Sequence, residues 1–247
     1  MLKSKRRSGN FSGHDDRVTS LAWCHLTLAS GSFDRSILQH DIRCRRPVHS
    51  YEGHKAVICS LKWNPESSTL ASGSNDNTVR LWDASMSGQR GRNKMFGTSS
   101  ARLCFNEHKA AVKALDWCPL KRNLLASGGG NKDQTIKFWD TCSGNLENSI
   151  DTGSQVSSIA WSKDAREVCT SHGSTENQLI LWKYPMMELL KELGGHGDRV
   201  LSMEMSPAGS SVVSVSADDT IRFWNIFEIF YHDIYYHRMI CFVHQNL

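Results

Sequence analysis

The chain has 247 residues, 39% of them hydrophobic, and a formal net charge of +4. Its length fits one large domain, such as an all-β ring, or two small domains, and its hydrophobic content is enough for a core. No stretch approaches the roughly 20 apolar residues of a membrane helix, and the basic start is not followed by the apolar run of a signal peptide. Because the charge is mild and the basic clusters are short, we expect no membrane and no nucleic-acid partner.

Five segments end in a similar strand-like sequence, which indicates an internal repeat. In chain order these ends are 36–41, 78–83, 135–140, 178–183 and 220–225. The last four carry tryptophan in the fifth position, where the first carries His40. Successive anchors are 42 (40 to 82), 57 (82 to 139), 43 (139 to 182) and 42 (182 to 224) residues apart. Three of these steps match the period of about 40–45 residues that is typical of WD40 blades.

The internal order of each unit predicts strands. In the second unit, 57–63 and 70–74 alternate at period two, as strands with two different faces must, and 78–83 follows them. Asn64-Pro65 and 75–77 supply the turns. Helical spacing with caps is almost absent, so we predict an all-β WD40 β-propeller with about five visible blades.

The predicted repeat domain covers residues 1–228. Its blades lie near 14–50, 51–107, 108–151, 152–195 and 196–228. The Gly/Ser/Arg-rich stretch 85–100 explains the one long step and is predicted to be a surface loop insertion. The aromatic-rich tail, 229–247, matches no repeat.

Most blades carry the parts of a buried hydrogen-bond chain, formed by a histidine, a strand Ser or Thr, an aspartate and the tryptophan. Buried polar groups are tolerated when they are satisfied, so these residues are expected as a set. The complete sets are His54/Asp76/Trp82, His108/Asp133/Trp139 and His196/Asp218/Trp224.

Repetition of the histidine–aspartate pair favours a scaffold role over acid–base catalysis, which needs one such site. No nucleophile elbow, H-E-x-x-H zinc motif, phosphate loop or dinucleotide fingerprint occurs in the chain. We therefore predict a non-catalytic protein without a cofactor.

Two blades depart from the set. The first keeps His14 and Asp34 but has His40 at the tryptophan position. The fourth lacks a histidine before its first strand and has Glu176 at the aspartate position. We therefore expect the fourth blade to be the least tightly held.

The eight cysteines lie singly, without a C-x-x-C pair. Four of them, Cys24, Cys59, Cys118 and Cys169, fall in apolar strand-like segments, which favours buried reduced thiols over disulfides or a metal site. The tail histidines at 232, 237 and 244 have spacings that fit no standard metal site. These features predict a metal-free protein of the nucleus and cytoplasm.

Several strings go beyond the common repeat pattern. They are 73–77 (GSNDN), 108–114 (HKAAVKA), 126–130 (ASGGG), 151–156 (DTGSQV), 171–173 (SHG), 177–185 (NQLILWKYP) and 222–225 (RFWN). Together they resemble the Fizzy and Fizzy-related WD40 coactivators of the anaphase-promoting complex. The string 36–43 (SILQHDIR) and the string DTGSQV look closer to the Fizzy-related branch.

The resemblance implies a substrate-recognition and activator subunit of a ubiquitin ligase in cell-cycle control. Members of that family bind degron-bearing protein substrates on the propeller and bring them to subunits of the anaphase-promoting complex, without ubiquitin chemistry of their own. Their top-face loops recognise the KEN-type degron through a few polar side chains.

Positions that match this family site include Asn75, Asn77 and Arg222. Amide and guanidinium groups suit an acidic, amide-rich peptide. Plain turn chemistry for the two asparagines and a solvated strand position for Arg222 remain as alternatives. Two positions depart from the family pattern: Glu176 stands where glutamine is usual, and Asn131 where threonine is usual. Because a carboxylate there repels an acidic degron, we expect a weakened KEN-type site.

The resemblance also sets expectations about the extent of the chain. The family builds seven blades, so the chain is expected to be N-terminally truncated, without two blades, the C-box type docking segment, a complete D-box groove or the terminal Ile-Arg dipeptide. Five blades of that curvature leave two open flanks, which predicts self-association. The alternative functions are a non-catalytic WD40 scaffold and a truncated product that lacks ligase docking.

Overall fold

The computed structural model describes residues 10–43, 46–84, 97–173 and 176–227. The aromatic-rich tail with its histidines lies outside these residues, as do the basic clusters 3–7 and 90–94. Every regular element in the described part is a strand, from β1 to β20, which confirms the all-β prediction. No helix in this part of the chain is long and apolar enough to cross a membrane.

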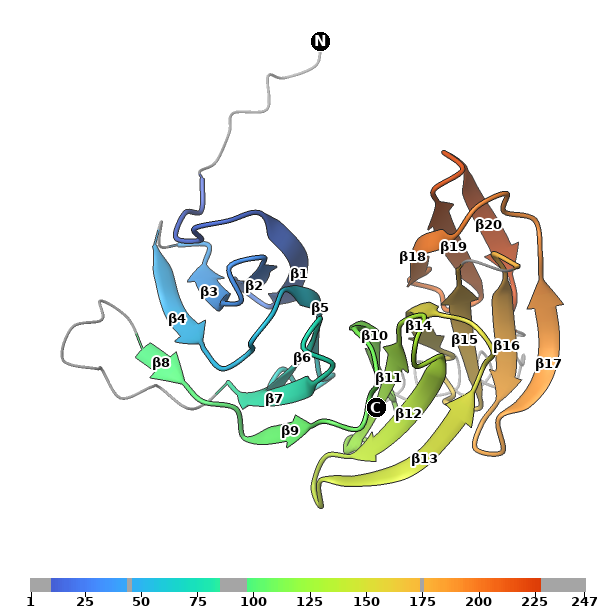
Figure 1. The fold of residues 1–247 in the computed structure, drawn as a ribbon, viewed down its shortest axis with the longest axis horizontal. Coiled ribbons are helices and arrows are strands. Elements are labelled where there is room, and N and C mark those ends of the chain that lie inside the picture. The colour runs from blue at the N-terminus through green and yellow to red at the C-terminus, as the bar shows by residue number, and fades with distance from the viewer. Residues whose placement is uncertain (1–9, 44–45, 85–96, 174–175, 228–247) are drawn as a thin grey trace, which may run out of the picture.

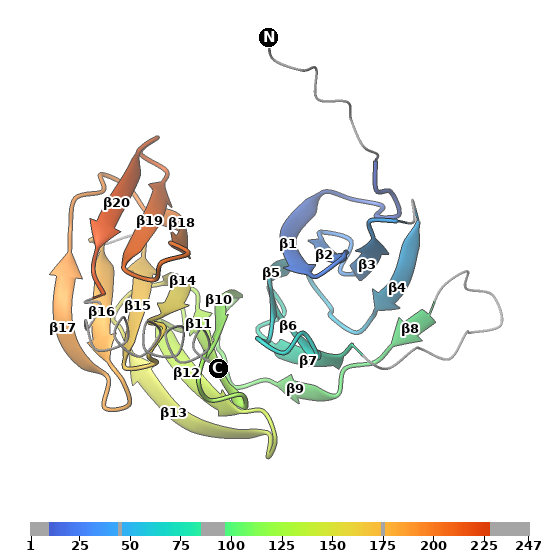
Figure 2. The ribbon, with the colours of Figure 1, turned by 180° about the vertical axis from the view of Figure 1, so that it is seen from behind.

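The strands form five sheets, one for each predicted blade (Figures 1 and 2). Blade 1 contains β1 (Val18–Cys24), β2 (Thr27–Ser32), β3 (Ile37–Asp41), β4 (Pro47–Tyr51) and β8 (Gly97–Ser99). Blade 2 contains β5 (Ile58–Trp63), β6 (Thr69–Ser74), β7 (Val79–Asp83) and β9 (Leu103–Phe105).

Blades 3, 4 and 5 are antiparallel meanders, and each contains only consecutive strands. Blade 3 contains β10 (Val112–Trp117), β11 (Leu124–Gly129), β12 (Thr135–Asp140) and β13 (Asn145–Asp151). Blade 4 contains β14 (Val156–Trp161), β15 (Glu167–His172), β16 (Leu179–Lys183) and β17 (Glu188–Leu193). Blade 5 contains β18 (Val200–Met205), β19 (Ser211–Ser216) and β20 (Ile221–Asn225).

The first strand of each blade lies innermost and contacts the first strand of the next blade, from β1 through β5, β10 and β14 to β18. In Figure 1 the blades follow one another along an open arc, with blade 1 (blue) and blade 5 (red) at its two ends. This is the predicted five-blade β-propeller arrangement.

Glycines let neighbouring blades approach closely. A Cβ added to Gly73 on β6 would lie 2.6 Å from Val112 O, and one added to Gly128 on β11 would lie 2.5 Å from Val156 Cγ1. Both contacts are made by the first strand of the following blade, so a larger residue would push that blade away. Buried apolar clusters fill the seams between blades.

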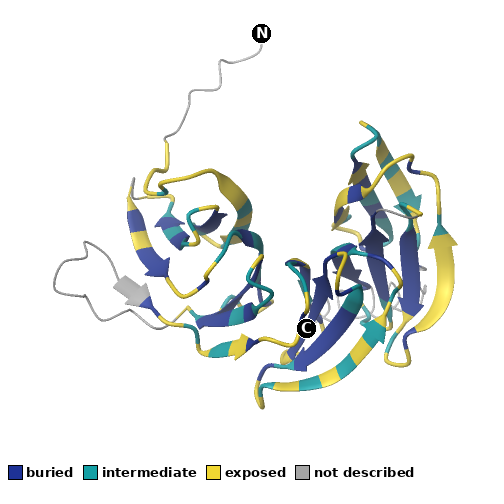
Figure 3. Ribbon diagram, in the orientation of Figure 1, coloured by how far each residue is buried: buried dark blue, intermediate teal, exposed yellow. Residues whose placement is uncertain are grey.

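Large apolar side chains are exposed on blades 1 and 5 (Figure 3). Trp23 on β1 is 61% exposed, whereas Trp63, at the same position in β5, is buried. Phe223 on β20 is 81% exposed, whereas Phe138, at the same position in β12, is buried. Within the described residues, no further blade covers these two faces.

Part of the predicted loop insertion is a strand, which corrects that prediction. Residues 85–96 lie outside the described residues, but β8 pairs in parallel with β4 of blade 1. His49 Nε2 also lies 2.9 Å from Ser99 Oγ. The physical reason is that β4 is an outer strand with free backbone donors and acceptors, which a passing segment can satisfy.

Candidate functional site

Three blades contain the complete predicted hydrogen-bond set, with the same geometry in each. In blade 2, His54 Nε2 lies 2.7 Å from Ser72 Oγ, and His54 Nδ1 lies 2.9 Å from Asp76 Oδ2. Trp82 donates its indole N–H to the same Ser72 oxygen at 2.8 Å. The equivalent residues of blades 3 and 5 are His108, Ser127, Asp133, Trp139 and His196, Ser214, Asp218, Trp224. These side chains hold strands together inside each blade.

Blade 1 contains a partial set. His14 Nδ1 lies 2.9 Å from Asp34 Oδ2, and His14 Nε2 lies 2.9 Å from Ser30 Oγ. His40, at the tryptophan position, contacts Ser12 O instead. Burial alone would raise the pKa of Asp34, but hydrogen bonds from Ser36, His14 and the Asp15 N–H lower it to about 2.

Blade 4 has a different hydrogen-bond set from the others. Its histidine is His172, at the end of β15 and not in the loop before β14. His172 Nδ1 lies 2.8 Å from Ser154 Oγ, and His172 Nε2 lies 2.7 Å from Thr170 Oγ1. Trp182 donates to Thr170 Oγ1 at 2.8 Å. Thr170 thus accepts the tryptophan N–H, and a histidine from the second strand links Thr170 to a loop serine without an aspartate.

Acid is expected to destabilise the chain through His172. Burial lowers the pKa of this imidazole from 6.5 to about 4. The contribution of the neutral imidazole to the free energy of unfolding is therefore fully present above pH 6.5 and is lost as the pH drops toward 4. The loss is about 2 kcal/mol between pH 7 and pH 5, before most carboxylates titrate. Urea unfolding at several pH values measures it, and His172→Gln should flatten the dependence. A midpoint that is constant from pH 7 to pH 5 would contradict the prediction.

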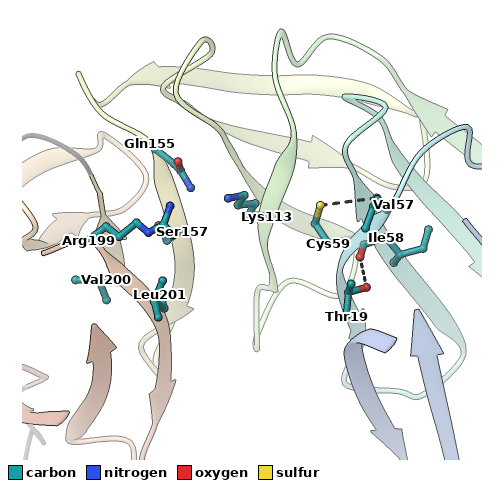
Figure 4. A pocket seen from close by; sticks show the side chains of 10 residues that line it. All are labelled: Thr19, Val57, Ile58, Cys59, Lys113, Gln155, Ser157, Arg199, Val200 and Leu201. Carbon is teal, nitrogen blue, oxygen red and sulfur yellow. Dashed lines mark hydrogen bonds between the residues drawn. The ribbon is translucent and has the colours of Figure 1, made fainter. Parts of the chain in front are cut away.

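A cavity of about 290 Å³ lies at the centre of the arc, among the first strands of all five blades (Figure 4). Each first strand has a β-bulge after its first residue. The bulged residues are Thr19, Cys59, Lys113, Ser157 and Leu201, and all five line the cavity. A bulge leaves its residue out of the ladder and re-aims the side chain, so one repeated irregularity builds this site.

The polar wall of the cavity is cationic and amide-bearing. Lys113 projects from β10, while Gln155 and Arg199 directly precede β14 and β18 (Figure 4). Thr19 and Ser157 add hydroxyl groups. No acidic residue is among the side chains that line the cavity in the described part of the chain. The arrangement therefore suits an anionic side chain with neighbouring amide groups.

Four of the predicted residues lie in connections between second and third strands, and none of them lines the cavity. In blade 2, the Asn75 N–H donates to Val57 O, and Cys59 Sγ lies 3.0 Å from Asn75 Oδ1. Asn77 has a φ of 64° and completes that turn. Asn131 and Glu176 are exposed in the equivalent connections of blades 3 and 4.

Arg222 lies elsewhere. It is the second residue of β20, the third strand of its blade, and it is not among the cavity-lining residues. Its guanidinium group packs over Gly195, where an added Cβ would come within 2.7 Å of Arg222 Nη1. Arg80 of blade 2 packs over Gly53 in the same way. The repetition fits the strand alternative more closely than a ligand contact.

Comparison with known proteins decides the family. The model of the CDC20/Fizzy WD40 domain matches residues 2–224. The chain belongs to the CDC20/Fizzy family. It is similar to "Cell division cycle 20.1, cofactor of APC complex" of Arabidopsis thaliana, with 50% identity over 88% of this chain and 46% of the relative.

Other CDC20/Fizzy relatives give similar values. "Anaphase-promoting complex subunit cdc20" of Dictyostelium discoideum is 47% identical over 87% of this chain and 42% of its own length. "Protein FIZZY-RELATED 3" of Arabidopsis thaliana is 45% identical over 90% of this chain and 44% of its own length. The chain thus spans less than half of these relatives. Whole-chain identity is slightly higher with the CDC20 proteins, although the short strings favoured the Fizzy-related branch.

A solved structure shares the fold. A chain of the "Crystal Structure of Mitotic Checkpoint Complex" is 36% identical and superimposes with a TM-score of 0.80 over 88% of this chain and 66% of that chain.

In this CDC20/Fizzy chain, sequence patterns did not single out three of the cavity-lining residues, Lys113, Gln155 and Arg199. The available signal was positional. Gln155 and Arg199 precede the first apolar residue of an inner strand, and Lys113 follows one, at the repeated bulge. Once the bulge is known, a polar residue at the same position as Thr19 or Ser157 can be recognised as a residue that lines the cavity.

Proposed function

We propose that this chain is the peptide-recognition part of a substrate-recognition and activator subunit of the anaphase-promoting complex, acting in cell-cycle control. The observation that carries the proposal is the cavity lined by Lys113, Gln155 and Arg199 in a CDC20/Fizzy chain. Two of the relatives above are named as a cofactor or a subunit of that complex. We also propose that the protein is non-catalytic, since its histidine–aspartate pairs are engaged inside blades.

The proposed ligand is a degron of the KEN type in a protein substrate. Its glutamate suits Lys113 and Arg199, which offer charge-assisted hydrogen bonds. Its asparagine suits Gln155 and the amides of Asn75 and Asn131, because an amide both donates and accepts. Four of these residues lie in connections between strands, and Lys113 lies near the start of β10. We infer that an extended peptide can contact several of them together.

Anisotropy titration with a fluorescent KEN-type peptide tests peptide recognition. The matched control peptide carries alanines in place of the Lys-Glu-Asn residues. We expect saturable binding of the first peptide and no saturable binding of the second. Equal binding of the two, or no binding of either, would refute this part of the proposal.

Association with the ligase is tested separately, by co-precipitation of anaphase-promoting-complex subunits from cell extract. Recovery of those subunits supports the activator role. Peptide binding without their recovery favours the alternative, a non-catalytic scaffold that lacks ligase docking. We further propose that the protein resides in the nucleus and cytoplasm, which imaging of a tagged chain checks.

Glu176→Gln is expected to strengthen binding of the KEN-type peptide about two- to threefold. The Glu176 carboxylate is exposed at the cavity end of blade 4, so its repulsion of an acidic peptide is weakened by solvent and salt. The matched control is Glu188→Gln, on the outer strand β17 of the same blade. Equal effects of the two substitutions would indicate a general charge effect and contradict the prediction.

A further inference from the structure

The dipeptide His172–Gly173 lies where β15 ends, next to the cavity. The two residues contact parts of the chain that carry the polar wall of the cavity, although neither His172 nor Gly173 lines the cavity itself. Blades 2, 3 and 5 place their histidine in the loop before the first strand, at His54, His108 and His196. Blade 4 therefore differs at the point where its loop carries Gln155.

On one side, His172 anchors the turn that precedes Gln155. The hydroxyl of Ser154 lies 2.8 Å from His172 Nδ1, and both residues are buried. The other ring nitrogen contacts Thr170 Oγ1, which already accepts the indole N–H of Trp182. A neutral imidazole satisfies both contacts, by donating to Thr170 and accepting from Ser154. The turn is thereby tied to the interior of its blade.

On the other side, Gly173 holds Gln155 and supports Arg199. The Gly173 N–H donates to Gln155 O at 3.3 Å. A Cβ added to Gly173 would lie 3.1 Å from Arg199 Cβ and 3.9 Å from Ser157 Oγ. Gly173 is not among the glycines with positive φ, so its function at this point is to leave space for Arg199.

We propose that His172–Gly173 is the positioning element of the peptide site, which orients Gln155 and Arg199 without touching the peptide. This inference rests on the proposed function. A Gln155 backbone held from Ser154 on one side and from Gly173 on the other presents its amide in one direction. An Arg199 packed against a glycine keeps its side chain over the cavity. Binding geometry held in advance raises affinity because less ordering is needed on binding.

The first test is a double-mutant cycle between Ser154→Ala and Gln155→Ala. Ser154→Ala removes the hydroxyl bound to His172 and leaves Thr170 and Trp182 in place. We expect it to weaken KEN-type peptide binding about fivefold, the effect of one neutral hydrogen bond, and by less than about twofold when Gln155 is already alanine. A purely structural effect would be equal in both backgrounds and would overturn the proposal.

The matched control for this cycle is Ser162→Ala. Ser162 is also a buried hydrogen-bonding serine of blade 4, but it lies at the opposite end of β14, where it contacts Asp164 and the Glu167 N–H. It should lower thermal stability as much as Ser154→Ala does and leave peptide affinity unchanged. An equal loss of affinity in both variants would also overturn the proposal.

The second test is Gly173→Ala, which places a methyl group against Arg199. We expect a severalfold loss of affinity that disappears in the Arg199→Ala background. Gly194→Ala is the control, because a Cβ there meets nothing within 4 Å. A Gly173→Ala chain that binds the peptide like the wild type would contradict the support of Arg199.

Failure of this inference is distinguishable from failure of the proposed function. If the wild-type chain binds no KEN-type peptide, the proposed function fails. Hydrogen–deuterium exchange then decides the positioning role without any peptide: Ser154→Ala should accelerate exchange in residues 154–157, and Ser162→Ala should not. Unchanged exchange in that segment would overturn the inference by itself.

Discussion

Replacing His108 by alanine is expected to lower the free energy of unfolding by about 3 kcal/mol, because a buried carboxylate loses its histidine partner. The side chains of His108 and Asp133 are 0% and 1% exposed. His108 Nε2 also lies 2.7 Å from Ser127 Oγ, the oxygen that accepts the N–H of Trp139. Removing the imidazole therefore disrupts contacts to the loop, the second strand and the third strand of blade 3. Urea unfolding followed by tryptophan fluorescence measures the loss.

His14→Ala in blade 1 is the matched comparison. The side chains of His14 and Asp34 are 7% and 14% exposed, so water can replace part of the lost hydrogen bonding. Its expected cost is about 1 kcal/mol. If His14→Ala cost as much as His108→Ala, burial would not govern the strength of these sets, and the prediction would be wrong.

Repetition made the blades and their hydrogen-bond sets predictable. The aspartate precedes the tryptophan by six residues, as in Asp76 and Trp82, because a tight turn and the same register on the third strand recur in each blade. A buried set also needs all its members, so three complete sets identify three similar blades. Sequence patterns therefore sufficed for the blades and for their hydrogen-bond sets.

Two of the features that the sequence did not predict depend on contacts between segments that do not repeat. The β8 strand joins blade 1 through hydrogen bonds to β4, more than forty residues earlier in the chain. His172, at the end of the second strand, replaces the missing loop histidine. The sequence position before the first strand, where a histidine was expected, gives no sign of this replacement. The cavity residues depend on bulges, whose position reflects backbone pairing and not residue type.

Charge reversal at Arg199 is expected to weaken binding of the KEN-type peptide about 50-fold at low salt, because it exchanges an attraction for a repulsion at a partly solvated site. Arg199 precedes β18 and lines the cavity together with Lys113 (Figure 4). The measurement is anisotropy titration of Arg199→Glu at low salt and again near 1 M salt. The difference from wild type should shrink at high salt, where the Debye length falls to about 3 Å.

Neutral substitutions of two arginines then decide which surface recognises the peptide. Arg199→Gln should weaken binding roughly tenfold, through loss of charge-assisted hydrogen bonds. Arg222→Gln should change binding by less than about twofold. Arg222 lies on the third strand of its blade and packs over Gly195, and the electrostatic effect of a charge falls with its distance from the ligand. If Arg222→Gln had the larger effect, recognition would lie on the outer strands, and the central cavity would not be the peptide site.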